Sequence, residues 1–447
     1  MSGRFDLGIE GGEVVTPRGR SRLHVYVAGG AIAALSAERL PAVEVVDASG
    51  LLVMPGMVDA HVHFMDPADP SREDFPTGTA AALRSGVTTV IEHTHARPVI
   101  TAADLAEKEE YLASRSRVDF ALGAHAWPDR LEAVPDVWQA GVAFVKVFTC
   151  TTHGVPGFST HSLKLLFEIA AAAGAVCLLH CEDEVLTGEA EKALREAGRT
   201  DNGIVPLWRS RDAELTALAA AAILARSAGA HAIAAHVSNP AGLDAAAGLL
   251  IESCPQYLYL LEKEVLDHGA FRKFTPPARA RSAADLDAMW QAVASGAIDY
   301  VSSDHAPSTR AQKQAGSIWD VHFGLPGIDT TFSALLTGAH RGVLSYERVT
   351  EVYSERPARI YGLWPAKGRL APGADADIVL VDSEAHWTVA DEDVVSKAGW
   401  SPFAGRTLVG RTVRTYVRGM LAMDGGEIIA EPGSGCFLRR DAGRVRP

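Results

Sequence analysis

The stretch Gly56-Met57-Val58-Asp59-Ala60-His61-Val62-His63 ends an apolar run with two histidines that stand two positions apart. In a β-strand the side chains of residues i and i+2 lie on the same face, so His61 and His63 can bind one metal ion together. A His-x-His pair on its own is more often two hydrogen-bonded histidines than a metal site. The rest of the chain therefore decides how this pair is interpreted.

Ala/Leu-rich segments alternate with short apolar runs from about residue 53 to residue 304. This alternation predicts βα units arranged around a parallel sheet. Eight runs of this kind predict an α/β fold, specifically a closed (β/α)8 TIM barrel. The expected strands are 53–63, 87–92, 119–125, 143–148, 175–180, 231–236, 249–254 and 299–304.

Both ends of the chain have a different pattern, with short β-branched stretches, glycine-rich turns and no Ala-rich helix between them. We expect the two ends to form one small β domain from residues 1–54 and 365–447. The barrel, residues 55–364, would then be inserted between the two halves of that domain.

Composition limits the kind of partner. The 447 residues carry a formal net charge of −13, which argues against nucleic-acid or membrane partners and favours a small-molecule substrate. The five cysteines are odd in number and mostly lie in apolar runs, which favours a reducing, cytoplasmic location over a disulfide framework. No signal peptide or membrane-spanning segment is expected.

Polar residues close several of the predicted strands: His63, Lys146, His180, His236 and Asp304 fall at or near the carboxyl end of a run. In a TIM barrel the active site is built at that end, so five unlike polar side chains would converge there. Each histidine alone is more often a core residue than a ligand, and Asp304 alone could be a helix cap.

Lys146 lies within the apolar stretch Val142-Ala143-Phe144-Val145-Lys146-Val147-Phe148, where a charged ammonium is costly to bury. A neutral lysine can react with carbon dioxide to give a carbamate, an anionic oxygen ligand able to bridge two cations. The alternative is a lysine at the strand end whose ammonium reaches solvent. From the residue alone the two readings carry equal weight.

Taken together, these residues form a nitrogen and oxygen ligand set for two divalent ions, with zinc the expected metal. His61 and His63 would serve one site, and His180 and His236 the other. A metal-bridging hydroxide would attack a substrate carbonyl. Asp304 is the candidate proton shuttle between that hydroxide and the leaving nitrogen.

The chain resembles the cyclic amidohydrolases of the amidohydrolase superfamily, namely hydantoinase or dihydropyrimidinase, allantoinase and dihydroorotase. The resemblance covers nearly the whole chain and rests on segments that are specific in combination. These segments are residues 55–63, 75–82, 145–148, 180–182, 236–238, 252–258, 303–307 and 372–377.

The resemblance implies a specific metal centre: His61, His63 and Asp304 would bind one metal, and His180 and His236 the other. Lys146, modified to N6-carboxylysine, would bridge the two ions. It also implies that the β domain is a sandwich, that the enzyme opens a cyclic amide by hydrolysis, and that it forms a homodimer or homotetramer.

Allantoin, hydantoins and dihydropyrimidines are the candidate substrates. Dihydroorotase-like sequences carry an arginine and an asparagine where this chain has Met65 and His95, so dihydroorotase activity is the less favoured alternative. His95 and Arg97 could bind an acidic group or be solvated loop residues. A metal-free scaffold resembling dihydropyrimidinase is the non-catalytic alternative. The candidate substrate-binding residues are His95, Thr151, Thr275, Pro326 and Gly327.

Overall fold

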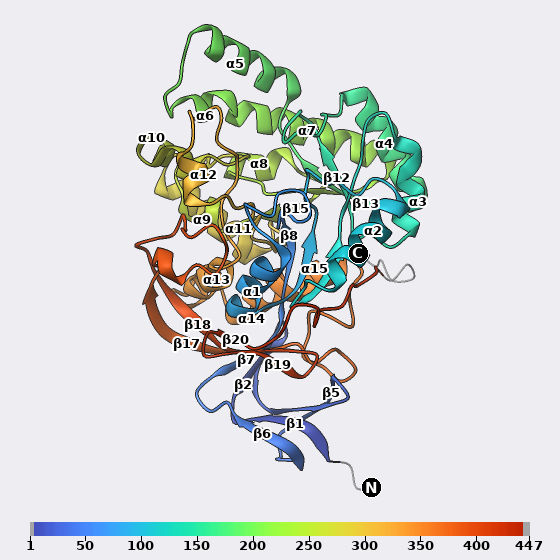
Figure 1. The fold of residues 1–447 in the computed structure, drawn as a ribbon, viewed down its shortest axis with the longest axis vertical. Coiled ribbons are helices and arrows are strands. Elements are labelled where there is room, and N and C mark those ends of the chain that lie inside the picture. Colours follow the sequence, from blue (N-terminus) through green and yellow to red (C-terminus); the bar gives the residue numbers. More distant parts are fainter. Residues whose placement is uncertain (1–3, 441–447) are drawn as a thin grey trace.

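The computed structural model describes residues 4–440 and shows a TIM barrel joined to a small β-sandwich (Figure 1). The sandwich lies at the bottom of the view, where strands from the start of the chain, in blue, lie near strands from its end, in red. The helices α5 to α7 lie at the opposite end of the molecule. The predicted α/β class and the barrel-plus-sandwich architecture are confirmed.

The barrel strands pair in parallel and in chain order, from β8 to β10 and then from β11 to β16, with β10 and β11 separated only by Gly123. A parallel bridge between Val62 and His305 joins the last strand region to the first, and His63 N donates to His305 O at 2.7 Å. These contacts close the barrel. The strands are β8 (Met57–Val62), β9 (Val87–Glu92), β10 (Asp119–Leu122), β11 (Ala124–His125), β12 (Val145–Phe148), β13 (Val176–His180), β14 (His231–Ala234), β15 (Leu250–Ser253) and β16 (Tyr300–Val301).

Side-chain caps and left-handed glycines set the ends of several barrel helices. Ser159 and Ser210 accept the first-turn N–H groups of α4 and α7, while Gly174 and Gly229 end these helices with positive φ. The helices are α1 (Phe75–Ser85), α2 (Ala102–Ala113), α3 (Val134–Gln139), α4 (Thr160–Ala173), α5 (Glu184–Glu196), α6 (Ile204–Trp208), α7 (Arg211–Ala228), α8 (Pro240–Ala245), α9 (Gln256–Tyr259), α10 (Glu264–His268), α11 (Ala283–Ser295), α12 (Arg310–Gln314), α13 (Thr331–His340), α14 (Tyr346–Thr350) and α15 (Arg356–Ile360).

The sandwich consists of two sheets, one of four strands and one of seven. Buried side chains from both chain ends, including Ile9, Val53 and Ile378, form its apolar core. In the four-stranded sheet the order is β5 (Ala31–Ser36), β4 (His24–Ala28), β1 (Phe5–Glu10) and β6 (Ala42–Asp47). In the seven-stranded sheet the order is β20 (Glu427–Ile428), β19 (Met420–Asp424), β18 (Thr407–Val417), β17 (Ile378–Thr388), β7 (Leu52–Pro55), β2 (Glu13–Thr16) and β3 (Gly19–Arg22).

The expected strand 53–63 differs from the structure, which divides it at Gly56 into β7 and β8. β7 pairs with β17 in the sandwich, whereas β8 pairs with β9 in the barrel. A Cβ on residue 56 would stand 2.1 Å from Thr88 Oγ1, so only glycine allows this close crossing between the two parts. One continuous apolar run therefore supplies a strand to each part of the fold.

The segment after β20 leaves the sandwich and lies against the barrel. Phe120 N donates to Cys436 O, and Leu438 N donates to Phe120 O, which extends the sheet beside β10. The chain thus returns to the barrel before residue 440.

All five cysteines are unpaired, and four of them are buried. Within residues 4–440, no helix combines the length and the apolar character needed to cross a membrane.

Candidate metal centre and active-site cavity

A cavity of about 280 Å³ is lined by all six predicted metal-site residues. They come from five strand regions; His61 and Lys146 lie within their strands, while His63, His180, His236 and Asp304 lie at or beyond the carboxyl end. This is the end at which TIM barrels build their active sites. His61 lies in β8 and His63 just after it, Lys146 lies in β12, His180 ends β13, and His236 and Asp304 follow β14 and β16.

Asp304 and Lys146 approach the same atom of His61. Asp304 Oδ1 lies 3.3 Å from His61 Nε2 and 3.5 Å from His63 Nε2. Lys146 Nζ lies 3.4 Å from His61 Nε2. Two ligands that each stand about 2.0 to 2.1 Å from a tetrahedral zinc ion are themselves about 3.3 Å apart. The separations of Asp304 Oδ1 from the two imidazole nitrogens fit ligands around a shared centre, and Lys146 Nζ lies beside the same nitrogen of His61.

His180 and His236 form the second pair of facing imidazoles. His180 Nδ1 lies 3.2 Å from His236 Nε2, and the His61 and His236 ring centroids are 5.4 Å apart. The second pair therefore lies beside the first, as two neighbouring ions would require.

The outward nitrogens of three of these histidines are held by acceptors, which fixes each ring and directs its other nitrogen inward. This is the usual arrangement around metal-binding histidines. The pairs are His61 Nδ1 with Glu252 Oε2 at 2.9 Å, His63 Nδ1 with His93 O at 3.2 Å, and His180 Nε2 with Glu182 Oε2 at 2.9 Å.

Burial controls the charge of these side chains. It lowers the pKa of His61 and His236 well below the ordinary value, with Lys146 adding to the effect, so both imidazoles are neutral and able to bind a metal. Burial also lowers the pKa of Lys146 to about 8, although Glu252 and Asp304 oppose the shift. The Lys146 side chain is 1% exposed and has no ion pair among the described residues.

His93 was not among the predicted ligands, but it lies next to two of them. Its ring centroid is 4.5 Å from that of His61 and 4.3 Å from that of His63. It is fully buried, and neither ring nitrogen has a hydrogen-bond partner within residues 4–440. The cluster of His61, His63 and His93 fits a metal site. The signal in the sequence was the position of His93 directly after the second strand.

The backbone around the cavity is strained. Five non-glycine residues within 4–440 have positive φ, and four of them line this cavity. Such conformations cost free energy and concentrate at functional sites. The four residues are Met65, His153, His236 and Asp304, with φ between 43° and 60°.

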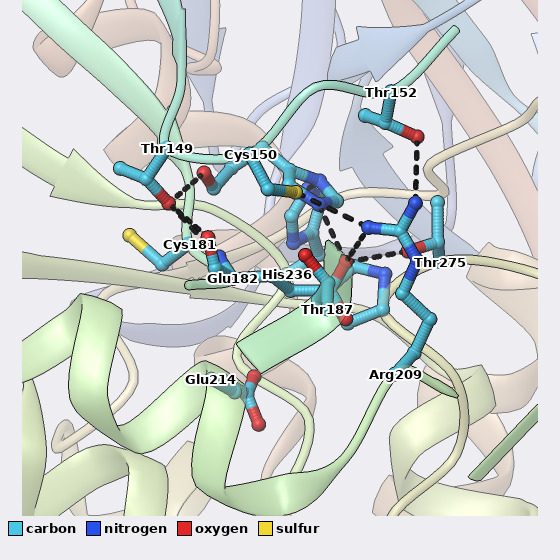
Figure 2. Close-up of polar contacts among 12 residues, drawn as sticks. Thr149, Cys150, Thr152, Cys181, Glu182, Thr187, Arg209, Glu214, His236 and Thr275 are labelled. Atoms are coloured by element: carbon cyan, nitrogen blue, oxygen red, sulfur yellow. Dashed lines mark hydrogen bonds and ion pairs between the residues drawn. The ribbon is translucent and has the colours of Figure 1, made fainter. Parts of the chain in front are cut away.

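Behind His180, Glu182 is the centre of a buried ion network. Arg209 Nη1 donates to Glu182 Oε2 at 3.0 Å, and Thr275 Oγ1 donates to the same oxygen at 2.7 Å (Figure 2). Arg279 Nη2 donates to Glu182 Oε1 at 2.5 Å. These cations hold the pKa of Glu182 well below its usual range despite burial. The network fixes the carboxylate that orients His180.

Cys150, His180 and Glu182 also lie close enough together to form a possible metal group. Burial raises the pKa of the Cys150 thiol to about 12, and Arg209 Nη1 donates to its sulfur at 3.2 Å. A protonated thiol is a poor metal ligand. This group is therefore part of the ion network around Glu182.

Two of the candidate substrate residues, His95 and Thr275, line the cavity. The His95 ring is 4.3 Å from that of His63 and stacks on His153 at 5.0 Å. Its Nδ1 lies 3.0 Å from His125 Nε2. The Thr275 hydroxyl donates to Glu182, so this side chain supports the second histidine pair as well as lining the cavity.

The other three candidates, Thr151, Pro326 and Gly327, do not line this cavity. Thr151 is exposed and its backbone N–H donates to Glu184. Gly327 instead packs against Ser303, the residue before Asp304, because a Cβ there would stand 2.7 Å from Ser303 O. Gly324, from the same turn, does reach the cavity.

A second cavity of about 280 Å³ lies between α1, α13 and the β17–β18 sheet. It contains none of the predicted ligands, and its polar lining includes Asp329, Asp393 and Arg411. The chemistry described above belongs to the first cavity.

Residues 52–421 match the model of the amidohydrolase family. The L-hydantoinase of Paenarthrobacter aurescens is 32% identical over 98% of both chains. A dihydroorotase of Halobacterium salinarum is 36% identical over 85% of this chain and 88% of that protein. An allantoinase of Rubrobacter xylanophilus is 34% identical over 97% of this chain and 98% of that protein.

A solved structure shows the same likeness. The L-hydantoinase from Arthrobacter aurescens superposes with a TM-score of 0.92 at 32% identity, covering 98% of this chain and 100% of that one. Family match, relatives and fold agree with the geometry of the cavity, and the chain belongs to the amidohydrolase family.

Proposed function

We propose that the protein is a binuclear metal-dependent hydrolase that opens a cyclic amide ring, such as a ureide, hydantoin or imide. The observation that carries this proposal is the convergence of six side chains from five strand ends in one cavity. Relatives named L-hydantoinase, allantoinase and dihydroorotase support the same class of reaction.

In this proposal, His61, His63 and Asp304 hold one ion and His180 and His236 the other. Lys146, as a carboxylated lysine, bridges the two sites. The lowered pKa of its buried amine supports this assignment, because the neutral amine is the form that reacts with carbon dioxide. Zinc is the proposed metal, given the imidazole and carboxylate ligands. Two such ions would supply an activated water and polarise the substrate carbonyl.

Asp304 is the proposed proton carrier. Its carboxylate is 12% exposed and opens onto the cavity, so it can contact both the attacking water and the ring nitrogen. One oxygen faces His61 and His63, which leaves the other free to accept the proton and return it to the leaving nitrogen. The left-handed backbone at Asp304 and the packing of Gly327 against the preceding Ser303 would help to position the carboxylate.

The rest of the cavity suits a single small ring. Phe148, Phe274 and Phe323 supply apolar walls, while His95 and Thr275 add polar groups beside the proposed metal site. We propose His95 and Thr275 as substrate contacts. Pro326 and Gly327 would act through the Asp304 segment, and Thr151 through the loop after β12.

The test is an assay of zinc-reconstituted protein on a panel of hydantoins, dihydropyrimidines, allantoin and dihydroorotate. Ring opening of at least one member is expected, and Asp304→Asn should lower kcat by about 100-fold or more while much of the metal stays bound. Inactivity on every ring would refute the proposal. A metal content near zero in protein purified without chelators would favour a non-catalytic scaffold instead.

We also propose a homodimer or homotetramer in a reducing cytosol. The outer helices carry exposed apolar side chains, including Val185 and Leu186 on α5, Leu207 on α6 and Ile223 on α7. Five free thiols support a reducing compartment. Light scattering coupled to size-exclusion chromatography measures the oligomer, and a monomer at micromolar concentration would contradict this assignment.

A further inference from the structure

Arg72 is a buried arginine that lines the active-site cavity from the segment between β8 and α1. Arg72 as a whole residue is 9% exposed. Its Nε donates to Pro307 O at 3.0 Å and to Ser308 Oγ at 3.1 Å. These bonds attach the guanidinium to the segment that follows Asp304 and orient it at the cavity wall.

Arg72 differs from the other buried arginines near the cavity in having no acidic partner. Arg209 and Arg279 both pair with Glu182, whereas Arg72 makes no ion pair within residues 4–440. Its two Nη groups make no hydrogen bond there either. Burial lowers the pKa of Arg72 to about 10, which leaves the guanidinium charged at pH 7.

A buried cation without a counter-ion is unfavourable unless something in the site compensates for it. Asp69, which also lines the cavity, is the nearby acid whose charge acts on Arg72. Its Oδ1 accepts the Ser71 hydroxyl at 2.6 Å, and it forms no ion pair with Arg72 among the described residues. The Nη edge of Arg72 is therefore available to a ligand.

The loop that carries His322 and Phe323 forms another part of the cavity wall. Lys273 Nζ donates to the carbonyl oxygens of Trp319, at 3.2 Å, and Val321, at 2.6 Å, and has no acidic partner among the described residues. These bonds hold the loop that carries His322 and Phe323 into the cavity. Met65, which also lines the cavity, carries no charge.

We propose that Arg72 binds an anionic substituent of the ring substrate, most simply a carboxylate. This inference rests on the proposed function, because the substituent would belong to the ring that is opened in the same cavity. A guanidinium presents two N–H groups in a fork that matches a carboxylate, which gives both affinity and orientation. Arg72 is thus a specificity residue, and the ring chemistry stays with the metal centre.

The experiment compares matched ligands that differ only in charge. The ligands are 5-(carboxymethyl)hydantoin and its 5-(carbamoylmethyl) amide, with dihydroorotate and its amide as the six-membered pair. Binding to the zinc-reconstituted protein is measured by calorimetry, and kcat and KM are measured wherever a ring is opened. For at least one pair, the acid should bind about 10-fold or more tightly than the amide.

Arg72→Gln should remove this preference by weakening the binding of the acid alone. For a ring that is opened, the change should appear as a higher KM for the acid. Arg72→Lys keeps the charge and should retain part of the preference, which separates charge recognition from support of the Pro307 segment. Arg97→Gln is the matched control, because Arg97 is exposed, pairs with Glu107 and lies outside the lining. The control should leave the ratio of acid to amide unchanged.

The outcomes separate the two proposals. If neutral rings are opened but no acid is preferred, or if Arg72→Gln leaves the preference intact, the anion subsite is refuted and the proposed function survives. An equal loss for acid and amide in both Arg72 variants would also refute it, since that result indicates a purely structural role. If acids bind with an Arg72-dependent preference but no ring is opened, the subsite stands and the hydrolase assignment fails.

Discussion

His61 lies between Glu252 and Lys146 at the centre of the candidate metal site. Its Nδ1 is 2.9 Å from Glu252 Oε2, and its Nε2 is 3.4 Å from Lys146 Nζ. Glu252 also accepts the His236 backbone N–H at 3.1 Å. One carboxylate therefore orients a ligand of each proposed ion.

Replacing Glu252 with glutamine tests this relationship. The neutral amide is a weaker acceptor for His61 Nδ1–H, so we expect metal affinity to fall about 10- to 100-fold. Competition with a fluorescent chelator measures the change. The control is Glu189→Gln on the exposed face of α5. Equal affinities in both variants would show that Glu252 does not hold the metal ligand.

Lys146→Ala removes the proposed bridging ligand. Bound metal should fall well below two ions per chain, and activity should fall by at least about 100-fold. A short carboxylic acid added to the assay should restore part of the bound metal and part of the activity, since it can replace the missing oxygen ligand. Lys164→Ala is the control, because Lys164 is exposed on α4 and pairs with Glu168. Full metal content in Lys146→Ala would remove the lysine from the site.

Gly327→Ala should disturb the segment that carries Asp304. Its new Cβ would meet Ser303 O at 2.7 Å, and such overpacking costs about 1 to 3 kcal/mol. We expect a lower Tm and a lower kcat. Gly188→Ala, in α5, has open space around its Cβ, and its free energy of unfolding should rise by about 0.5 to 1 kcal/mol. Unchanged kcat in Gly327→Ala would show that this packing does not position Asp304.

The buried carboxyl of Asp329 predicts how the stability of the fold depends on pH. Burial raises its pKa, and its Oδ2 has no hydrogen-bond partner within residues 4–440, while Oδ1 accepts Val395 N–H at 2.8 Å. Because the folded state holds this proton more tightly than the unfolded state, the carboxyl lowers stability as the pH rises through its raised pKa. The destabilisation is complete above that pKa and absent below the unfolded value.

Asp329→Asn should therefore raise the free energy of unfolding at pH 7, by about 1 kcal/mol, and change it little at pH 3.5. Urea unfolding at both pH values measures the difference. Asp382→Asn, in the same second cavity but partly exposed, should change the free energy of unfolding less. A gain that is equal at the two pH values would contradict the assignment of the effect to the Asp329 charge.

The order of the barrel strands and the convergence of the six predicted residues on one cavity could be predicted from the sequence because both follow from local pattern. His63, Lys146 and Asp304 each close or follow an apolar run, and parallel strands bring such positions to one edge. The division of the expected strand 53–63 into β7 and β8 at Gly56 was not predicted, because the run is apolar on both sides of the glycine. The domain limits 1–54 with 365–447, and 55–364, stay a prediction.

Residues whose roles depend on distant partners were missed. Within residues 4–440, Arg72 has no acidic partner and the His93 ring has no hydrogen-bond partner, and neither fact can be read from the sequence. Gly327 was placed near the substrate by motif position, but its contact with Ser303 is visible only in three dimensions. Local pattern predicts which residues reach the barrel end and leaves open which of them face the cavity.

The most direct test is a zinc titration of chelator-treated protein, with ring opening of its best substrate as the readout. Activity should be absent without metal and should rise to a plateau at two equivalents of zinc per chain, since two groups of ligands face one cavity. Full activity in the metal-free protein, or a plateau at one equivalent, would contradict the two-metal centre.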